Sequence, residues 1–328
     1  MLQEIDFQRP KYGQHVQVPS APIAQPSETP TTDRLTDEDI KIIRDIAPNA
    51  AVITCIDAKP KIPLPLTPYE ALQELGEIDD IDVLEVLKCT LNSNSIKRLA
   101  SLTVKQSMSK LWQKHRKGRI TGSKMHSVFT LRESTSRTNI IKSILGMLPD
   151  VKTPSMKYGI EKEDTATRTY SKFQNEFHQN FKCEPTGLIL NAKYPHLGSS
   201  LDGRVECGCC GKGCLEIKCL AKYKDGLPGP ILADDPQCSS EIDSDIWFLS
   251  HDKNYPVDDN FQLKKSHQYF TQVQGHMLIT EVDYCDLYLW SKTRSITVRV
   301  DRDNDFIEKL CTKLLTHVVP KLMENSSL

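Results

Sequence analysis

A mixed β-sheet flanked by helices, the architecture of an α/β protein, is predicted from three features of this 328-residue chain. Its C-terminal two-thirds alternate between helix-like and strand-like patterns: helices, three strands, a helix, two strands and a closing helix. Apolar residues make up 38% of the chain, enough for a packed core. No apolar run approaches the ~20 residues that a membrane-spanning helix needs. We therefore expect a folded α/β domain with no membrane partner.

The elements of this domain follow from residue spacing. A helix is predicted over 104–117, after a segment that begins near Ser101, and Thr121 or Ser123 can cap the next helix. A long helix is predicted over 155–178, because four residues share one face at spacings of four, three and four: Gly159, Glu163, Ala166 and Tyr170. The remaining expectations are strands at 185–191, 200–207 and 214–219, a helix at 262–280, strands at 283–291 and 294–301, and a helix at 304–324.

The N-terminal part of the chain has a different composition. Residues 1–35 are rich in Pro, Gln, Ser and Thr and cannot bury enough surface to order themselves. A capped helix is predicted to begin after Thr36, and residues 69–99 have an acidic, helical pattern beyond a Pro-rich linker. We therefore expect an N-terminal extension at 1–100 and a folded domain at 101–328, with a loop insertion at 220–258.

The net charge of −1 conceals an uneven distribution. Residues 1–96 contain eight Lys and Arg against sixteen Asp and Glu, whereas residues 97–149 contain twelve against one. A basic surface of this kind binds phosphates by releasing their counterions. The alternative is a solvated helix face without a ligand.

Eleven cysteines in a long chain whose N-terminus lacks a secretory pattern indicate reduced thiols. We therefore expect an intracellular protein, located in the nucleus if its source is eukaryotic.

Two short segments carry the residues for a hydrolytic site. In the strand pattern Leu215–Cys219, Glu216 and Lys218 point to the same face because strand side chains alternate. Asp202 precedes Gly203 at a turn, and a hairpin between the two segments would bring both carboxylates together. Two carboxylates and a backbone carbonyl suit Mg²⁺ or Mn²⁺. The alternatives are an ordinary Asp-Gly turn and an exposed ion pair.

Two further polar residues extend this prediction. Glu163, on the long helix, offers a third carboxylate and with it a second metal ion. Gln272 shares a helical face with Tyr269 and His276 and can hydrogen-bond a water or a phosphate. The alternatives are a solvated helical acid for Glu163 and a partly buried polar residue for Gln272.

Five segments in order carry a resemblance to a known family: Trp112–Ser123, Gly159-x-x-x-Glu163-x-x-Ala166, Ser200–Gly203, Leu215–Cys219 and Gln272–Gln274. Together they resemble the YqaJ viral recombinase family, similar to the phage lambda exonuclease and a branch of the PD-(D/E)xK nucleases. The resemblance covers about residues 105–325 and implies a restriction-endonuclease-like core. It also implies a DNA exonuclease that digests linear duplexes from a phosphorylated 5′ end, in recombination, repair or mobile-element biology.

The resemblance implies a role for each residue of the candidate site. Asp202, Glu216 and the Ile217 carbonyl would bind metal, and Glu163 would support one of two ions. Lys218 and Gln272 would assist the attacking water.

Three other residues fall where relatives hold the DNA 5′-phosphate: Arg116, Ser123 and Ser200. An Arg fork with hydroxyl donors suits a terminal phosphate. The resemblance is compatible with an oligomer, and the acidic N-terminal region could recruit a recombination partner protein.

The chain departs from the family pattern at two positions, where Leu201 and Leu220 replace prolines. An alternative function is a catalytically silent DNA-binding module of mobile-element origin. The four residues Glu163, Asp202, Glu216 and Lys218 argue against it, because binding alone requires none of them.

Four cysteines in eight residues raise the question of zinc: Cys207, Cys209, Cys210 and Cys214. Four thiolates can hold Zn²⁺ tetrahedrally, although adjacent Cys209 and Cys210 are closely spaced for one ion. The alternative is a Gly-rich hairpin with reduced cysteines. Cys219 is expected to pack in the core.

Overall fold

The structure is a computed structural model that describes residues 37–48, 62–75, 83–132, 134–149, 153–227, 248–251 and 261–325. The chain divides into two compact units, residues 1–61 and 62–328. In the first unit, the helix expected after Thr36 is confirmed as α1 (Asp37–Ile46). The expectations for residues 1–35 lie outside the described residues, as does most of the insertion at 220–258.

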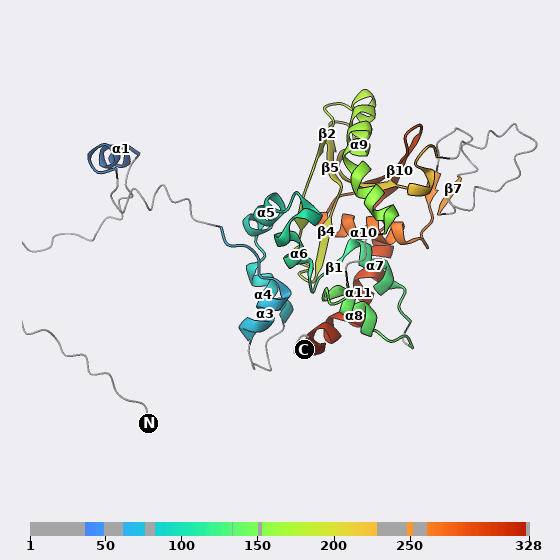
Figure 1. The fold of residues 1–328 in the computed structure, drawn as a ribbon. Helices are drawn as coiled ribbons and strands as arrows, with labels where there is room; N and C mark the ends of the chain where they lie inside the picture. Colours follow the sequence, from blue (N-terminus) through green and yellow to red (C-terminus); the bar gives the residue numbers. More distant parts are fainter. Residues whose placement is uncertain are drawn as a thin grey trace, which may run out of the picture. The chain divides into compact units, whose positions relative to one another are not determined.

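The second unit is built around a five-stranded mixed sheet with the order β10-β9-β6-β5-β2 (Figure 1). Its strands are β2 (Lys182–Glu184), β5 (Gly203–Cys207), β6 (Gly211–Cys219), β9 (Tyr284–Trp290) and β10 (Ser295–Asp301). β6 and β9 run parallel, and the other neighbours are antiparallel. The predicted α/β class and the last two predicted strands are confirmed.

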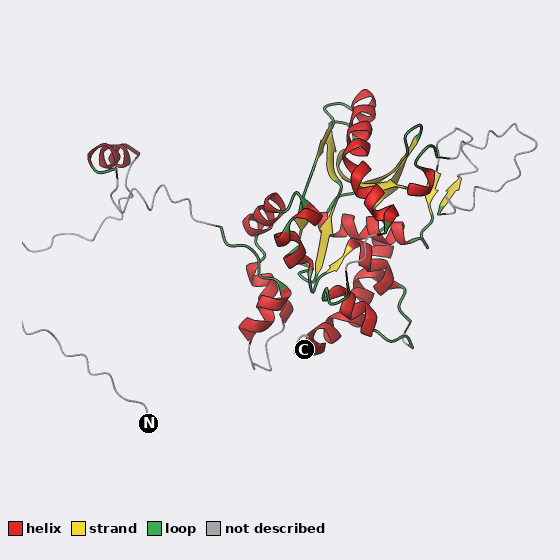
Figure 2. Ribbon diagram, viewed as in Figure 1, coloured by secondary structure: helices red, strands yellow, loops and turns green. Residues whose placement is uncertain are grey.

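Helices cover both faces of this sheet (Figure 2). On one face, α9 (Pro154–Phe177) packs Ala166 and Tyr170 against the strands, as its predicted face requires. On the other face lie α10 (Gln268–Thr280) and α11 (Asn304–Asn325). Strand β9 is buried throughout, because its alternate side chains enter the two cores.

A second sheet, with the order β1-β4-β3, adjoins α10. It contains β1 (Ile120–Thr121), β3 (Leu188–Ile189) and β4 (Leu197–Ser200), with β1 parallel to β4. The segment between the first predicted helix and the next, Arg119–Thr121, is thus partly a strand. Thr121 occupies the N-cap position of α7 (Gly122–Phe129), although its side chain does not cap the helix.

The helices expected over 69–99 are found as α3 (Pro68–Leu75), α4 (Val83–Thr90) and α5 (Ser93–Leu102). They belong to the same compact unit as the sheets, which begins at Ile62 rather than near residue 101. Leu91 and Leu99 pack against Leu188 and Leu190 of the β3 region. The buried Arg119 guanidinium donates a 2.8 Å hydrogen bond to the Leu66 carbonyl. These contacts tie 62–102 to the rest of the unit.

Three predicted elements were wrong in part. The helix over 104–117 is divided into η1 (Gln106–Met108) and α6 (Lys110–Arg116), because Ser109 leaves the helical conformation and caps α6. The strand at 185–191 is replaced by β2 and β3. The helix at 262–280 begins only at Gln268, after β8 (Phe261–Leu263) has paired with β7 (Leu249–His251).

The remaining described elements are α8 (Thr138–Ile144) and η2 (Ala221–Tyr223). Within the described ranges, none of the helices combines the length and the apolar character that crossing a membrane requires.

Candidate active site

The β5–β6 hairpin brings Asp202 next to the strand that carries Glu216. Asp202 lies just before β5, and its backbone N–H donates to the Leu215 carbonyl at 3.2 Å. Its Oδ2 accepts a 2.6 Å hydrogen bond from the Ile217 backbone N–H. The side chain of Gln106 holds the preceding residue, donating to the Leu201 carbonyl at 2.7 Å. Hydrogen bonds to β6 and to Gln106 therefore hold this turn in place.

Glu216 and Lys218 project from β6 toward α10, on the opposite face from Leu215 and Ile217, as strand alternation predicted. Lys218 Nζ lies 2.6 Å from Glu216 Oε1. Gln272 Nε2 donates to the same oxygen at 2.6 Å, and Gln272 Oε1 accepts from Lys218 at 3.3 Å. The three side chains thus form a closed ring of hydrogen bonds.

His276 is a member of this site that the sequence analysis did not single out. Its Nε2 lies 3.1 Å from Glu216 Oε2, and its Nδ1 lies 2.8 Å from the Ser199 hydroxyl. It follows Gln272 by one helical turn, so the shared helical face was the available clue. Gly122 makes room for the ring, because a Cβ there would lie 2.6 Å from His276 Cε1.

Glu163 reaches the same cleft from α9. The cleft has a volume of about 620 Å³, and its lining includes Glu163, Asp202, Glu216, Ile217 and Lys218. Glu163 is half-buried, and Glu216 and Lys218 act on it electrostatically. Three carboxylates from α9, the turn before β5, and β6 therefore share one cavity.

Burial and mutual repulsion set the charge states of these acids. Burial, followed by the charges of Glu216 and Glu163, raises the pKa of Asp202 well above its usual value. Burial and Glu216 likewise raise the pKa of Glu163. Burial would also raise the pKa of Glu216, but Lys218 and His276 lower it to about 2. Burial opposes the charged form of Lys218, yet Glu216 and Asp202 raise its pKa.

This donor set fits a hard divalent cation. Asp202, Glu216 and Glu163 supply carboxylate oxygens, which Mg²⁺ and Mn²⁺ prefer to nitrogen or sulfur. Burial and then the repulsion between the acids raise the pKa values of Asp202 and Glu163, and a cation in the cleft would relieve that repulsion.

A basic cluster, formed by Arg116 with Trp112, Ser200 and Thr121, lies near this cleft. Arg116 donates to the hydroxyls of Ser200 and Thr121 at 3.2 Å each, and its guanidinium stacks 3.9 Å over the Trp112 ring. Trp112 Nε1 also donates to Ser200 at 2.8 Å. Ser199 and Ser200 are neighbours on β4, and their side chains point to opposite sides of the strand. Ser199 contacts His276 and Ser200 contacts Arg116, so β4 connects the carboxylate cleft with the basic cluster.

Ser123 is not among the residues that make these contacts. Within the described residues, the hydrogen bonds of Arg116 go to Ser200 and Thr121, and Ser123 is exposed in the first turn of α7. The next residue, Lys124, interacts electrostatically with Arg116; burial and this charge lower the pKa of Lys124 to about 8. Lys124 is therefore a second cationic side chain in the basic cluster, beside Arg116.

The cysteine-rich hairpin turn departs from its sequence-based description. Cys207, Cys209 and Cys210 lie together, but the fourth member of the group is His178. Cys214 is fully buried on β6, where its thiol donates to the Tyr284 carbonyl at 3.7 Å. Strand alternation turns Cys214 into the core, so it is not part of this cluster.

The fold and the site define an α/β protein in which three acidic residues and a lysine line one cleft, near a cluster of basic side chains. Residues 111–283, more than half of the chain, match the model of the YqaJ-like viral recombinase domain. The chain belongs to this family, and the resemblance of its five sequence motifs is confirmed. No curated protein matches the chain significantly.

Several solved structures resemble the chain, among them the following two. An alkaline exonuclease from Laribacter hongkongensis is 19% identical, with a TM-score of 0.45, over 67% of this chain and 95% of its own. The shutoff and exonuclease protein of Kaposi's sarcoma-associated herpesvirus is 14% identical, with a TM-score of 0.44, over 75% of this chain and 76% of its own.

Proposed function

We propose that this protein is a metal-dependent DNA nuclease, an exonuclease that digests linear duplex DNA from a 5′-phosphorylated end. One observation carries the proposal: Glu163, Asp202, Glu216 and Lys218 line a single cleft although they come from three separate elements. A protein that only binds DNA needs a basic surface and not three acids around a lysine.

Asp202, Glu216 and the Ile217 carbonyl would hold the first Mg²⁺ or Mn²⁺ ion, and Glu163 would support a second. A bound ion supplies Lewis acidity, which lowers the pKa of water and offsets charge on a phosphate. His276 and Gln272 hold the Glu216 carboxylate in place through bonds of 3.1 and 2.6 Å. A carboxylate fixed in this way needs little reorganisation when it binds a cation.

Lys218 and Gln272 are the groups for the chemical step. The carboxylates around Lys218 raise its pKa, so it stays an ammonium at neutral pH. A positive charge at this position stabilises the negative charge that develops on the scissile phosphate. Gln272, bonded to both Lys218 and Glu216, can orient the attacking water through its amide.

The basic cluster would recognise the DNA end. Arg116 and the Ser200 hydroxyl offer the donors that a terminal phosphate requires, and Lys124 adds charge. Burial lowers the pKa of Arg116 to about 10, so its guanidinium is still charged at neutral pH. Not every basic residue of 97–149 contributes, because Arg119 is fully buried and bonded to backbone carbonyls.

The test is degradation of end-labelled linear duplex DNA with a 5′-phosphate or a 5′-hydroxyl, in Mg²⁺, in Mn²⁺ and in EDTA. We expect metal-dependent digestion that is faster on the phosphorylated end. Lys218→Ala should abolish digestion while leaving DNA binding nearly intact, because it removes transition-state stabilisation. Lys212→Ala, an exposed lysine on the same strand, is the matched control and should digest normally.

Two outcomes contradict the proposal. Folded protein that binds DNA but digests none of it with either metal would favour the silent DNA-binding module. Equal digestion by wild type and Lys218→Ala would point to a contaminating nuclease or to another site.

A further inference from the structure

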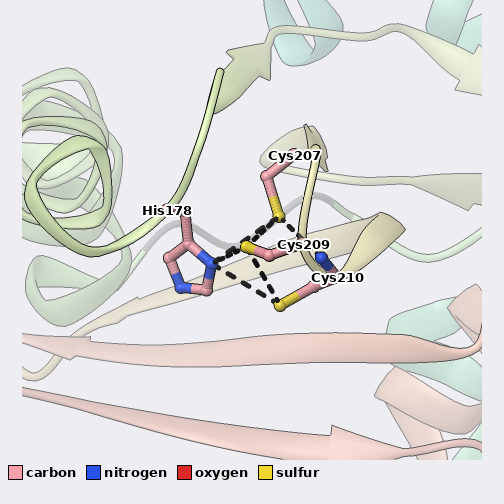
Figure 3. Close-up of side chains that lie close together, drawn as sticks. All are labelled: His178, Cys207, Cys209 and Cys210. Atoms are coloured by element: carbon pink, nitrogen blue, oxygen red, sulfur yellow. Dashed lines mark hydrogen bonds between the residues drawn. The ribbon is translucent and has the colours of Figure 1, made fainter.

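We propose that the protein has a structural zinc site formed by His178, Cys207, Cys209 and Cys210, apart from the carboxylate cleft. His178 is the C-cap residue of α9, Cys207 ends β5, and Cys209 and Cys210 lie in the turn that leads to β6 (Figure 3). Their ligand atoms, one imidazole nitrogen and three sulfurs, all lie within 4.8 Å of one another. The site would therefore join a helix end to a hairpin turn.

The separations between these atoms agree with a tetrahedron around one zinc ion. Zn–S and Zn–N bonds of about 2.3 and 2.0 Å give edges of roughly 3.8 Å between sulfurs and roughly 3.5 Å between sulfur and nitrogen. The sulfur of Cys209 lies 3.5 Å from that of Cys207 and 3.8 Å from that of Cys210. His178 Nδ1 lies 3.6, 3.1 and 3.5 Å from the sulfurs of Cys207, Cys209 and Cys210.

The ligand set explains how adjacent cysteines can share one ion. The sulfurs of Cys209 and Cys210 lie 3.8 Å apart, which matches the sulfur–sulfur edge of a zinc tetrahedron. Here His178 approaches from a different element, and the Gly208 backbone N–H donates to the Gln179 carbonyl at 2.7 Å, so the two loops are already joined. Gly211, with a φ of 75°, lets the chain leave the turn and enter β6.

Two hydrogen-bond donors lie close to the cysteine sulfurs. The Cys210 backbone N–H lies 3.2 Å from Cys207 Sγ, and Arg299 Nη1 lies 3.2 Å from Cys210 Sγ. Three thiolates and a neutral imidazole around Zn²⁺ leave one net negative charge, which the Arg299 guanidinium offsets. Such outer contacts orient the ligands of a metal and tune its binding.

Arg299 also connects this cluster to the core. Its guanidinium pairs with Asp286 at 2.9 Å, and Asp286 accepts a 2.6 Å hydrogen bond from Tyr170 of α9. Zinc at the turn would thus stabilise the attachment of α9, which carries Glu163, to the hairpin that carries Asp202 and Glu216. Its role would be structural, because all four ligands come from the protein and leave no open position.

The direct test is metal titration of the reduced, chelator-treated full chain with Zn²⁺ and with Co²⁺. The Asp202→Asn variant is titrated in parallel, so that metal bound in the carboxylate cleft can be distinguished from metal bound at the cysteine–histidine cluster. We expect one tightly held zinc per chain in both proteins. Cobalt should give a thiolate charge-transfer band and the visible bands of a tetrahedral site. Cys209→Ser and His178→Ala should each lower zinc affinity by at least about a hundredfold.

The controls are Cys89→Ser, an exposed thiol elsewhere, and Cys214→Ala, the excluded fourth cysteine; both should bind zinc like wild type. Alkylation of the unmutated protein adds a test independent of folding: Cys207, Cys209 and Cys210 should be protected with zinc and reactive after chelation. The proposal is overturned by undiminished zinc in His178→Ala and Cys209→Ser. It is equally overturned by loss of zinc in Cys214→Ala, or by thiols that react only after reduction.

Discussion

His276 holds Glu216 through a direct contact, with its Nε2 3.1 Å from the Glu216 Oε2. A carboxylate accepts hydrogen bonds, so Nε2 is the donor to Glu216, and Nδ1 lies 2.8 Å from the Ser199 hydroxyl. This chain of bonds runs from β4 through α10 to β6. It fixes which way the Glu216 carboxylate faces in the cleft.

Replacing His276 should therefore impair catalysis without loosening the DNA. His276→Ala is expected to lower kcat by about 10- to 100-fold, the usual effect of removing a group that orients a metal ligand, with little change in Kd. His276→Gln keeps a donor at the position of Nε2 and should recover part of the rate. Single-turnover digestion and equilibrium binding separate the two effects. Equal losses in the Ala and Gln variants would refute the positioning role.

Two glycine substitutions should change stability in opposite directions. A Cβ at Gly122 would lie 2.6 Å from the His276 ring, and two hydrogen bonds restrict the movement of this ring. Gly122→Ala should therefore lower the free energy of unfolding by about 1–3 kcal/mol. Gly159, also helical, has open space at its Cβ position, and Gly159→Ala should add about 0.5–1 kcal/mol. Urea unfolding measures both; a neutral Gly122→Ala would show that the ring gives way.

Arg116→Ala should weaken the preference for phosphorylated DNA ends more than it reduces digestion of hydroxyl ends. The side chain loses its bonds to Ser200 and Thr121, whereas the carboxylate cleft is untouched. The ratio of rates on the two substrates is the measurement. Arg132→Ala removes an exposed charge from the same basic segment and should leave that ratio unchanged. A proportional loss on both ends would contradict the end-recognition role.

Two buried histidines should make the fold sensitive to acid. Burial, followed by the charge of Arg119, lowers the pKa of both His115 and His196 to about 4. The unfolded chain binds these protons near pH 6.5, so the free energy of unfolding is highest above that pH and falls as the pH approaches 4. Each histidine contributes at most about 1.4 kcal/mol per pH unit. Urea unfolding between pH 4.5 and 7 should show this slope.

The double variant His115→Gln/His196→Gln is the control for this slope. It removes both titrating groups, so its free energy of unfolding should vary less with pH, whatever its absolute stability. An unchanged slope would assign the acid sensitivity to other groups.

The spacing of residues along the sequence predicted those features that helix and strand periodicity determine. The face of α9 and the alternation of Glu216 and Lys218 on β6 follow from helix and strand periodicity, and both are as expected. The break at Ser109 and the strand β8 were missed, because capping and pairing with β7 outweighed a weak helical pattern. His178 was missed as a neighbour of Cys209, since nothing local relates residues 31 positions apart.

The single parallel pair in the main sheet has a consequence for variation in this family. β6 and β9 can pair only after the chain between Cys219 and Tyr284 has closed into a loop. Loop-closure entropy grows with the logarithm of length, about 0.6 kcal/mol for each doubling. The segment after β6 can therefore lengthen or shorten in different members at little thermodynamic cost to the strand that holds Glu216. The start of that segment, Leu220–Tyr223, lines the cleft, so changes of length beside it would alter the lining before they weakened the strand.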